Sequence, residues 1–143
     1  MRLREVIDNL LTTAQTLPMV KRAERGDVYV NWNAQSGEYG AFNVDIETFV
    51  PNGMFTTANV VMYFGDRLTP DRTNDIDVQE DGLNVIQSII NLVQNAAEEN
   101  DVYLTFGDYT ATPFTQKFSD ELAGVYARVA ITYKNNIGNC ANV

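Results

Sequence analysis

Histidine is absent from this chain of 143 residues, and cysteine occurs once, as Cys140. Without histidine, Ser-His and Cys-His nucleophile systems and His-ligated metal sites are excluded. A single cysteine cannot form a disulfide within the chain, which fits a reducing compartment or assembly inside a cell. Cys140 lies in a polar tail whose nearest basic residue is Lys134, so a catalytic thiolate is not expected. These absences leave carboxylate chemistry open.

Long apolar runs and clustered basic residues are also missing. No apolar run is long enough to span a bilayer, and the stretch MRLREVIDNLL predicts an amphipathic helix and not a signal peptide. The glycines at 26, 37, 40, 53 and 65 are isolated and form no phosphate-binding motif. The net charge is −9, from 19 acidic and 10 basic residues. This charge disfavours binding to a nucleic-acid backbone as the main activity, although contact with the rim of a DNA-filled pore stays open.

Charge is lacking altogether from Leu83 to Ala97, within a stretch whose apolar residues recur at helical spacing. On a helical wheel the apolar residues form two adjacent stripes: Leu83, Ile86, Ile90, Val93 and Ala97, then Val85, Ile89, Leu92 and Ala96. The remaining arc holds Asn84, Gln87, Ser88, Asn91, Gln94 and Asn95. One interpretation is a broad core face. The other is that the second stripe and the amide edge contact another copy, because interface cores are depleted in charge.

A second candidate contact is the segment GDYTATPFTQKFSDE between the last two predicted strands. It is longer than the two to five loop residues that a hairpin needs. We expect an arm that places its aromatic residues on a neighbouring subunit, and the alternative is a loop folded back on its own domain. The hypothetical subunit interface therefore comprises Asn84, Val85, Ile89, Asn91, Leu92, Asn95, Phe114 and Phe118.

The order of periodic segments predicts the fold class. We expect residues 2–16 to form a helix limited by Pro18, and residues 28–33 and 39–50 to form a hairpin whose polar face exposes Asn43, Asp45 and Glu47. PNGM is a turn, and residues 57–67 form a strand covered on both faces. Thr73 or Asn74 caps a helix that ends near residue 99, and strands follow at 102–111 and 122–135. Residues 1–143 are thus one α+β domain, with two helices packed on a mainly antiparallel sheet.

Candidate sites for chemistry are weak. The acidic stretch DRTNDIDVQEDG fits a calcium loop best when Asp77 takes the first position, but Ser88 then stands where a bidentate glutamate belongs. Asp45 and Glu47 share a strand face, which is ordinary for an exposed strand. Trp32, Tyr39, Phe114 and Phe118 suit either a binding platform or a core. We expect no catalytic residues, no metal, no cofactor and no enzymatic activity.

The centre of the chain, YFGDRLTPDRTNDIDVQEDGLNVIQSII, resembles phage tail-terminator and neck proteins, especially those from phages of gut Bacteroidales, including crAss-like phages. The matching positions are Asp66, Arg67 and Leu68 after a strand, Asp71 and Asn74, Gln79, and the apolar helix from Leu83. A late alternating strand, Val125 to Tyr133, before Cys140 also fits. The stretch AQSGEYGAFNVD is longer and more polar than the family's first hairpin.

This resemblance implies a structural ring protein of the virion neck or tail, assembled in the host cytoplasm. Such a ring contains six or twelve copies, joins portal to tail through neighbouring portal, neck or tail proteins, and surrounds a channel that DNA passes through without specific binding. No membrane partner is implied. The alternative function is that of a small acidic adaptor or inhibitor acting as a monomer or dimer. A carboxylate enzyme would need a pocket with converging acids.

Overall fold

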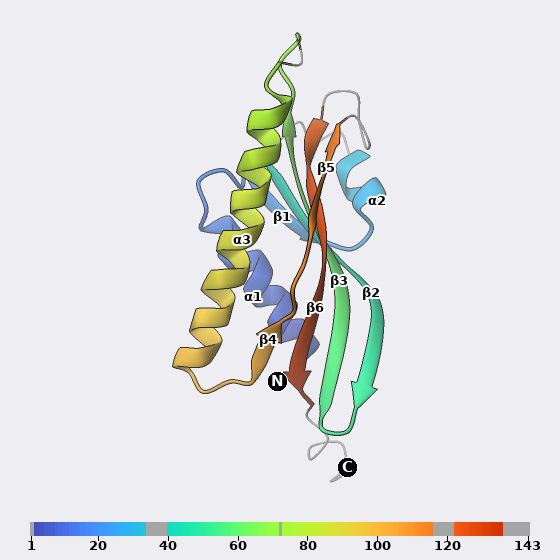
Figure 1. Cartoon of the computed structure of the whole chain (residues 1–143), viewed down its shortest axis with the longest axis vertical. Coiled ribbons are helices and arrows are strands. Elements are labelled where there is room, and N and C mark those ends of the chain that lie inside the picture. Colours follow the sequence, from blue (N-terminus) through green and yellow to red (C-terminus); the bar gives the residue numbers. More distant parts are fainter. Residues whose placement is uncertain (1, 34–39, 72, 116–121, 136–143) are drawn as a thin grey trace.

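The computed structural model describes residues 2–33, 40–71, 73–115 and 122–135, without the side chains of residues 30 and 33 (Figure 1). In these residues the helices are α1 (Leu3–Gln15), α2 (Val28–Asn33) and α3 (Asp75–Glu99). The strands are β1 (Arg22–Arg25), β2 (Ala41–Asn52), β3 (Phe55–Arg67), β4 (Leu104–Phe106), β5 (Ala111–Thr115) and β6 (Leu122–Lys134). The predicted helices at 2–16 and 75–99 are therefore confirmed.

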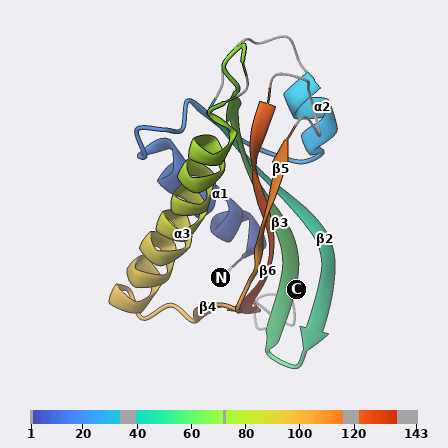
Figure 2. The ribbon, with the colours of Figure 1, turned by 45° about the horizontal axis from the view of Figure 1, so that its top comes forward.

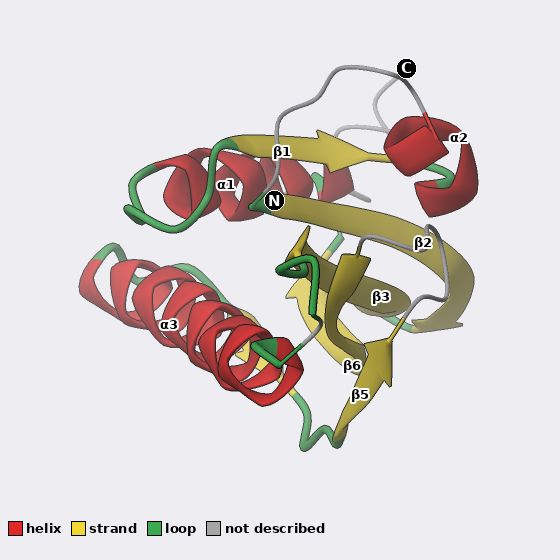
Figure 3. Cartoon of the chain, turned by 90° about the horizontal axis from the view of Figure 1, so that it is seen from above, coloured by secondary structure: helices red, strands yellow, loops and turns green. Residues whose placement is uncertain are grey.

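The described strands form a six-stranded sheet in the order β1-β2-β3-β6-β4, with β5 also paired to β6. β1 runs parallel to β2, and the other pairs are antiparallel. The sheet is curled, and α1 and α3 lie on one side of it (Figures 1 and 3). The predicted α+β class is confirmed, since two helices pack on a mostly antiparallel sheet.

The main core lies between these two helices and the sheet. Val6, Ile7 and Leu10 of α1 are buried there, as are the α3 residues Val85, Ile86, Ile89, Ile90 and Val93. The sheet contributes the alternating β6 residues Val125, Ala127, Val129, Ile131 and Tyr133, as their period predicted. β3 is buried on both faces from Val60 to Met62, which also agrees with its continuous apolar sequence.

The long β2–β3 hairpin extends beyond the rest of the sheet (Figures 1 and 2). Gly53 takes a φ of 64° in its turn, as the PNGM signal predicted, and this left-handed conformation suits glycine. β1 pairs only with Ala41 to Val44 of β2, so β2 has no described neighbour on its outer side beyond that point. Every residue from 47 to 54 is exposed.

The prediction of a strand at residues 28–33 is wrong, because this segment is the helix α2. Asp27 starts the helix: its Oδ1 accepts the Tyr29 N–H at 2.9 Å, and its carbonyl oxygen accepts the Asn31 N–H at 3.0 Å. Val28 and Trp32, four residues apart, are both buried on one helical face. Six residues are too few for the alternation of apolar residues to distinguish a strand from one helical turn and a half.

The predicted hairpin of 28–33 with 39–50 is consequently absent, and β2 pairs instead with β1 and β3. Its polar face is not uniformly exposed either. Asn43 is fully buried, and its amide forms hydrogen bonds with Asn31 of α2 and with the carbonyl oxygen of Gly26, which lies between β1 and α2. Asp45 is half-buried, and Glu47 is exposed, as predicted for this face.

The expected strand at 102–111 is two short strands, β4 and β5, separated by residues 107–110. β5 pairs with β6 from Ala111↔Ala127 to Thr115↔Ala123, so the first part of the predicted arm belongs to the subunit's own sheet. The segment's remaining residues, 116–121, lie outside the described residues. The arm prediction is therefore wrong for Ala111 to Thr115, where local sequence gave no sign of the pairing with β6.

Candidate subunit interface

The outer surface of α3 is the first part of the candidate interface. Its exposed residues between 83 and 97 are Asn84, Gln87, Asn91, Leu92, Asn95 and Ala96, none of them charged. Leu92 exposes 47% of its surface. Of the predicted interface residues, Asn84, Asn91, Leu92 and Asn95 are thus accessible to a partner.

Two residues predicted to lie at the interface are placed elsewhere. Val85 and Ile89 are buried to 3% and 0% exposure in the core beneath α3, so they cannot contact a neighbouring copy. Half of the second apolar stripe therefore belongs to the chain's own core between α1, α3 and the sheet. Leu92 and Ala96 alone in that stripe reach solvent.

Some of the amides on α3 have partners within the chain. Gln94 Nε2 donates to the Leu104 carbonyl oxygen at 2.7 Å, and Gln94 Oε1 accepts the Phe106 N–H at 3.3 Å. Gln79 Nε2 donates to the Phe114 carbonyl oxygen at 3.2 Å. These glutamines satisfy backbone groups on the outer edges of β4 and β5, which protects that side of the sheet from pairing with another strand.

The second part of the interface lies on α1. No charged residue occurs from Asn9 to Val20, and Asn9, Thr12 and Thr13 of this stretch line a groove together with residues of α3. This groove of about 270 Å³ runs between the two helices and β4. Its lining is uncharged and consists of Asn9, Thr12, Thr13, Val93, Ala96, Ala97, Asn100, Val102 and Leu104. Sequence reasoning missed this groove, although the charge-free run in the first helix was a visible signal.

The third part is the tip of the β2–β3 hairpin. Phe49, Val50 and Met54 are 56%, 52% and 57% exposed. No charged residue occurs from Thr48 to Gly65. At the base of the tip, the Phe55 and Tyr103 rings lie 4.7 Å apart, and the Asn135 N–H donates to the Met54 carbonyl oxygen at 2.7 Å. The apolar tip is therefore supported by β6 and by the residue before β4, and the sequence analysis did not single it out.

Phe114 does not belong to an exposed surface. It is 7% exposed and lies in a small second core with Val28, Trp32, Ala41 and Leu122. Its ring centroid is 6.2 Å from that of Trp32, which lies over Gly65 on the side of the sheet away from α3. The interface prediction for Phe114 is wrong, and Trp32 and Phe114 are core residues. Phe118, Tyr39 and Cys140 lie outside the described residues.

The residues that carry the family resemblance build the connection from β3 to α3. Asn74 Oδ1 accepts the Thr69 N–H at 2.8 Å, and Asn74 Nδ2 donates to the Arg67 carbonyl oxygen at 3.2 Å. Asn74 occupies the N-cap position, but its side chain makes no capping hydrogen bond to α3. Leu68 is buried with Val78 and Ala123. These side chains fix the direction in which α3 leaves the sheet.

Asp71 lies in the same connection. Its carboxylate accepts hydrogen bonds from the Thr69 hydroxyl at 2.6 Å, the Thr73 hydroxyl at 3.0 Å and the Thr73 N–H at 3.3 Å. The hydrogen bond from Thr69 is the largest cause that holds the pKa of Asp71 below its ordinary value, and the bonds from Thr73 act in the same direction. Asp71 therefore stabilises the loop in its ionised form.

Charged groups gather on the face of the sheet opposite α1 and α3. Glu47 Oε1 lies 3.2 Å from Arg128 Nε, and the Arg128 guanidinium lies 5.6 Å from the Tyr126 ring centre. Burial raises the pKa of the neighbouring Tyr63. The hollows beside Arg128 hold Glu47 and Asp108 and are wide open to solvent. Glu47 forms an ion pair with Arg128. Asp45 and Glu47 therefore do not form the pair of free carboxylates that a hydrolase needs.

The predicted calcium-loop frame is helical throughout, since Asp77, Asp81 and Ser88 all belong to α3. Across the described part of the chain, no group of three Asp, Glu or Cys side chains is arranged to hold a metal ion. Helices long and apolar enough to cross a membrane are likewise not found among those residues. No protein-family model matches the chain, and no curated protein matches it in sequence.

Proposed function

We propose that this chain is a structural protein of a phage virion, which assembles as a closed ring of six or twelve copies in the neck or tail. The ring joins portal to tail and surrounds the DNA channel. It acts by geometry and contact and carries no catalytic residues. The proposal combines the resemblance of the central sequence with the surface of the folded chain.

One observation carries the proposal: the exposed face of α3 between residues 83 and 97, together with the half of α1 that begins at Asn9, is free of charge on a chain whose net charge is −9. The exposed residues of α3 from Asn84 to Ala96 are amides, Leu92 and Ala96, and the adjoining half of α1 is also uncharged. A soluble monomer usually turns charged residues to water on such a face. A face depleted in charge suits a contact with another protein subunit.

The carboxylates lie outside this uncharged face, and they suit the wall of a DNA channel. They occur at both ends of α3 and on the opposite face of the sheet, for example Asp77, Glu98 and Glu47. A channel wall that is acidic repels the phosphate backbone, so DNA slides through it without adhering. In a ring, each subunit contacts its two neighbours through different surfaces, and the rotation closes.

Electron cryo-microscopy of purified virions that contain this chain tests the proposal. We expect density for the chain as a closed ring between portal and tail, with six or twelve copies. Virions whose neck and tail lack the chain, or an isolated chain in the capsid shell, would contradict the proposal. An adaptor or inhibitor would instead be found outside the particle, bound as a monomer or dimer to its target.

A further inference from the structure

We infer that the tip of the β2–β3 hairpin of one copy docks into the uncharged groove between α1 and α3 of the next copy. This inference rests on the proposed ring, because it names the two surfaces through which neighbouring subunits meet. The occupant of the groove is thus a second copy of the same chain.

The hairpin has the features of the inserting partner. Phe49, Val50 and Met54 expose more than half of their surface at its tip, which protrudes beyond the other elements (Figure 2). Exposed apolar side chains gathered on one protrusion mark a site of protein contact. The Thr57 and Thr132 hydroxyls lie 2.8 Å apart across β3 and β6, so the hairpin is braced before it meets a partner. A braced tip loses little conformational entropy on docking.

The groove has the features of the receiving partner. It is a concave site with a volume of about 270 Å³, and its lining has neither acid nor base. Val93 and Ala97 form its apolar floor on α3, and Thr12 lies on its α1 wall. The exposed Leu92 lies one helical turn before the lining residue Ala96 on α3. An apolar tip can therefore enter without burying an unpaired charge.

The positions of the two surfaces favour a head-to-tail contact. The helical layer lies on one side of the molecule, and the hairpin tip lies at the far side of the sheet (Figures 1 and 2). A tip cannot reach the groove of its own chain, but it can reach the groove of a neighbour. Two different, complementary patches on one chain generate a heterologous contact, and such contacts form rings when the rotation closes.

The charges that border the two surfaces are complementary. Lys134 stands opposite Phe55 at the base of the hairpin tip, where no acidic residue occurs from Thr48 to Phe55. Three acidic residues lie at the end of the groove near the C-terminus of α3. They are Glu98, Glu99 and Asp101, which are adjacent in sequence to the lining residues Ala97, Asn100 and Val102. Docking the tip brings a cation toward three carboxylates, which orients the contact. A tip-to-tip contact would instead bring two lysines together.

Cross-linking between two single-cysteine variants tests this contact. One variant carries Cys140→Ser and Met54→Cys at the tip, and the other carries Cys140→Ser and Thr12→Cys in the groove. The control mixture pairs the tip variant with Cys140→Ser, Thr112→Cys, an exposed position on β5. All are full-length chains at millimolar concentration under mild oxidation. We expect a roughly tenfold excess of mixed disulfide for tip and groove over the control, because docked thiols react at a raised effective concentration.

A yield equal to that of the control mixture would overturn the inference, as would a dominant disulfide between two Met54→Cys chains. Copy number is measured separately by native mass spectrometry of the unmodified chain. A ring of copies without the mixed disulfide removes the docking mode and leaves the ring. A mixed disulfide without a closed ring supports the docking mode and counts against the proposed function.

Discussion

Gly82 of α3 packs against Phe64 of β3 so closely that a Cβ at position 82 would lie 2.9 Å from the Phe64 ring. The same Cβ would lie 2.9 Å from a methyl group of Val125. Glycine in a helix interior costs up to about 1 kcal/mol relative to alanine. Here the missing side chain allows α3 to lie close to the sheet. This seating places the uncharged face of α3 on the outside.

Replacing Gly82 with alanine should therefore lower the free energy of unfolding, although alanine favours the helix. Overpacking a rigid core costs about 1 to 3 kcal/mol, and the gain in helix propensity offsets about 1 kcal/mol of it. We expect a net loss of about 1 kcal/mol in chemical denaturation. Asn84→Ala, two residues along the same helix on the exposed face, should raise stability slightly. A stabilised Gly82→Ala variant would show that α3 is not seated as described.

The elements that were predicted correctly from the sequence are long enough for their apolar residues to repeat several times. α1, α3 and β6 each repeat their apolar residues often enough to distinguish a helix from a strand, and the class followed from them. β1 has the sequence RAER and no apolar alternation, so its parallel pairing with β2 left no local signal. α2 is too short for the spacing of its apolar residues to distinguish a helix from a strand. The hydrogen bond from the Tyr29 N–H to Asp27 favours the helix.

The candidate interface was predictable only in part. The uncharged outer face of α3 followed from Asn84, Asn91 and Asn95 on one arc of the wheel. Which of the apolar stripes was buried depended on how far the sheet curls, and no local pattern encodes that. The groove needs Thr12 and Val93 to meet, although they are far apart in the chain. Phe114 was predicted to lie on an exposed arm because the local sequence gave no sign that Ala111 to Thr115 form the strand β5, which pairs with β6.

The burial of Phe114 gives a second prediction. Phe114→Ala should lower the free energy of unfolding by about 3 kcal/mol, because it leaves a cavity beside Trp32. Phe49→Ala at the hairpin tip removes the same side chain from an exposed site and should change stability by no more than about 0.5 kcal/mol. Denaturant titration of both variants measures the difference. Equal losses would mean that Phe49 also packs within its own subunit.

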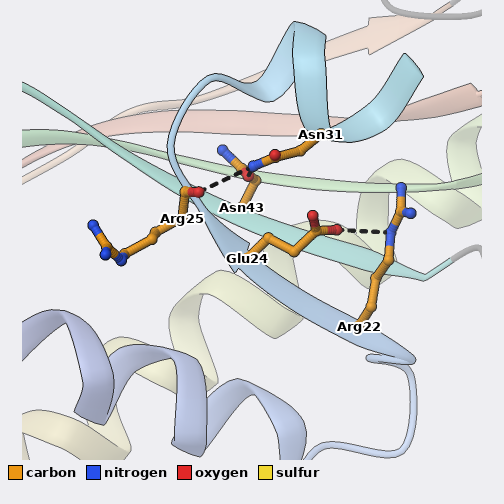
Figure 4. A network of polar contacts seen from close by, with 5 residues as sticks. All are labelled: Arg22, Glu24, Arg25, Asn31 and Asn43. Atoms are coloured by element: carbon orange, nitrogen blue, oxygen red, sulfur yellow. Dashed lines mark hydrogen bonds and ion pairs between the residues drawn. The ribbon is translucent and has the colours of Figure 1, made fainter. Parts of the chain in front are cut away.

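Asn43 gives a third prediction, from the polar network in Figure 4. Its Oδ1 accepts the Asn31 amide at 2.8 Å, and its Nδ2 donates to the Gly26 carbonyl oxygen at 2.9 Å. Asn43→Ala removes both hydrogen bonds from a fully buried position and leaves the half-buried Gly26 carbonyl oxygen without this donor, which should cost about 2 kcal/mol. Asn59→Ala removes an exposed hydrogen bond to Thr48 and should cost less than about 1 kcal/mol. Faster amide exchange at α2 in the Asn43 variant alone would locate the effect.

Asp71 gives a prediction of pH dependence. Because its pKa in the folded chain is lowered, its ionised form stabilises the fold above the unfolded pKa, near 3.8. That contribution is lost as the pH falls through the lower folded pKa. Asp71→Asn should therefore be less stable than the wild type at pH 6 and should lose this disadvantage in strongly acidic solution. Unfolding curves across this range measure it, and a difference that stays constant with pH would exclude the ionised carboxylate as its source.

The account depends most on the claim that the uncharged face of α3 is an assembly surface. Native mass spectrometry of the wild-type chain, Leu92→Glu and Ile76→Glu at one high concentration tests it. Both variants place a carboxylate at an exposed apolar position of α3, but Ile76 lies in the acidic first turn, outside the uncharged face. The account predicts six or twelve copies of the 16.0 kDa chain for the wild type and Ile76→Glu, and a monomer for Leu92→Glu. A wild type that stays monomeric, or a Leu92→Glu variant that assembles as the wild type does, would contradict it.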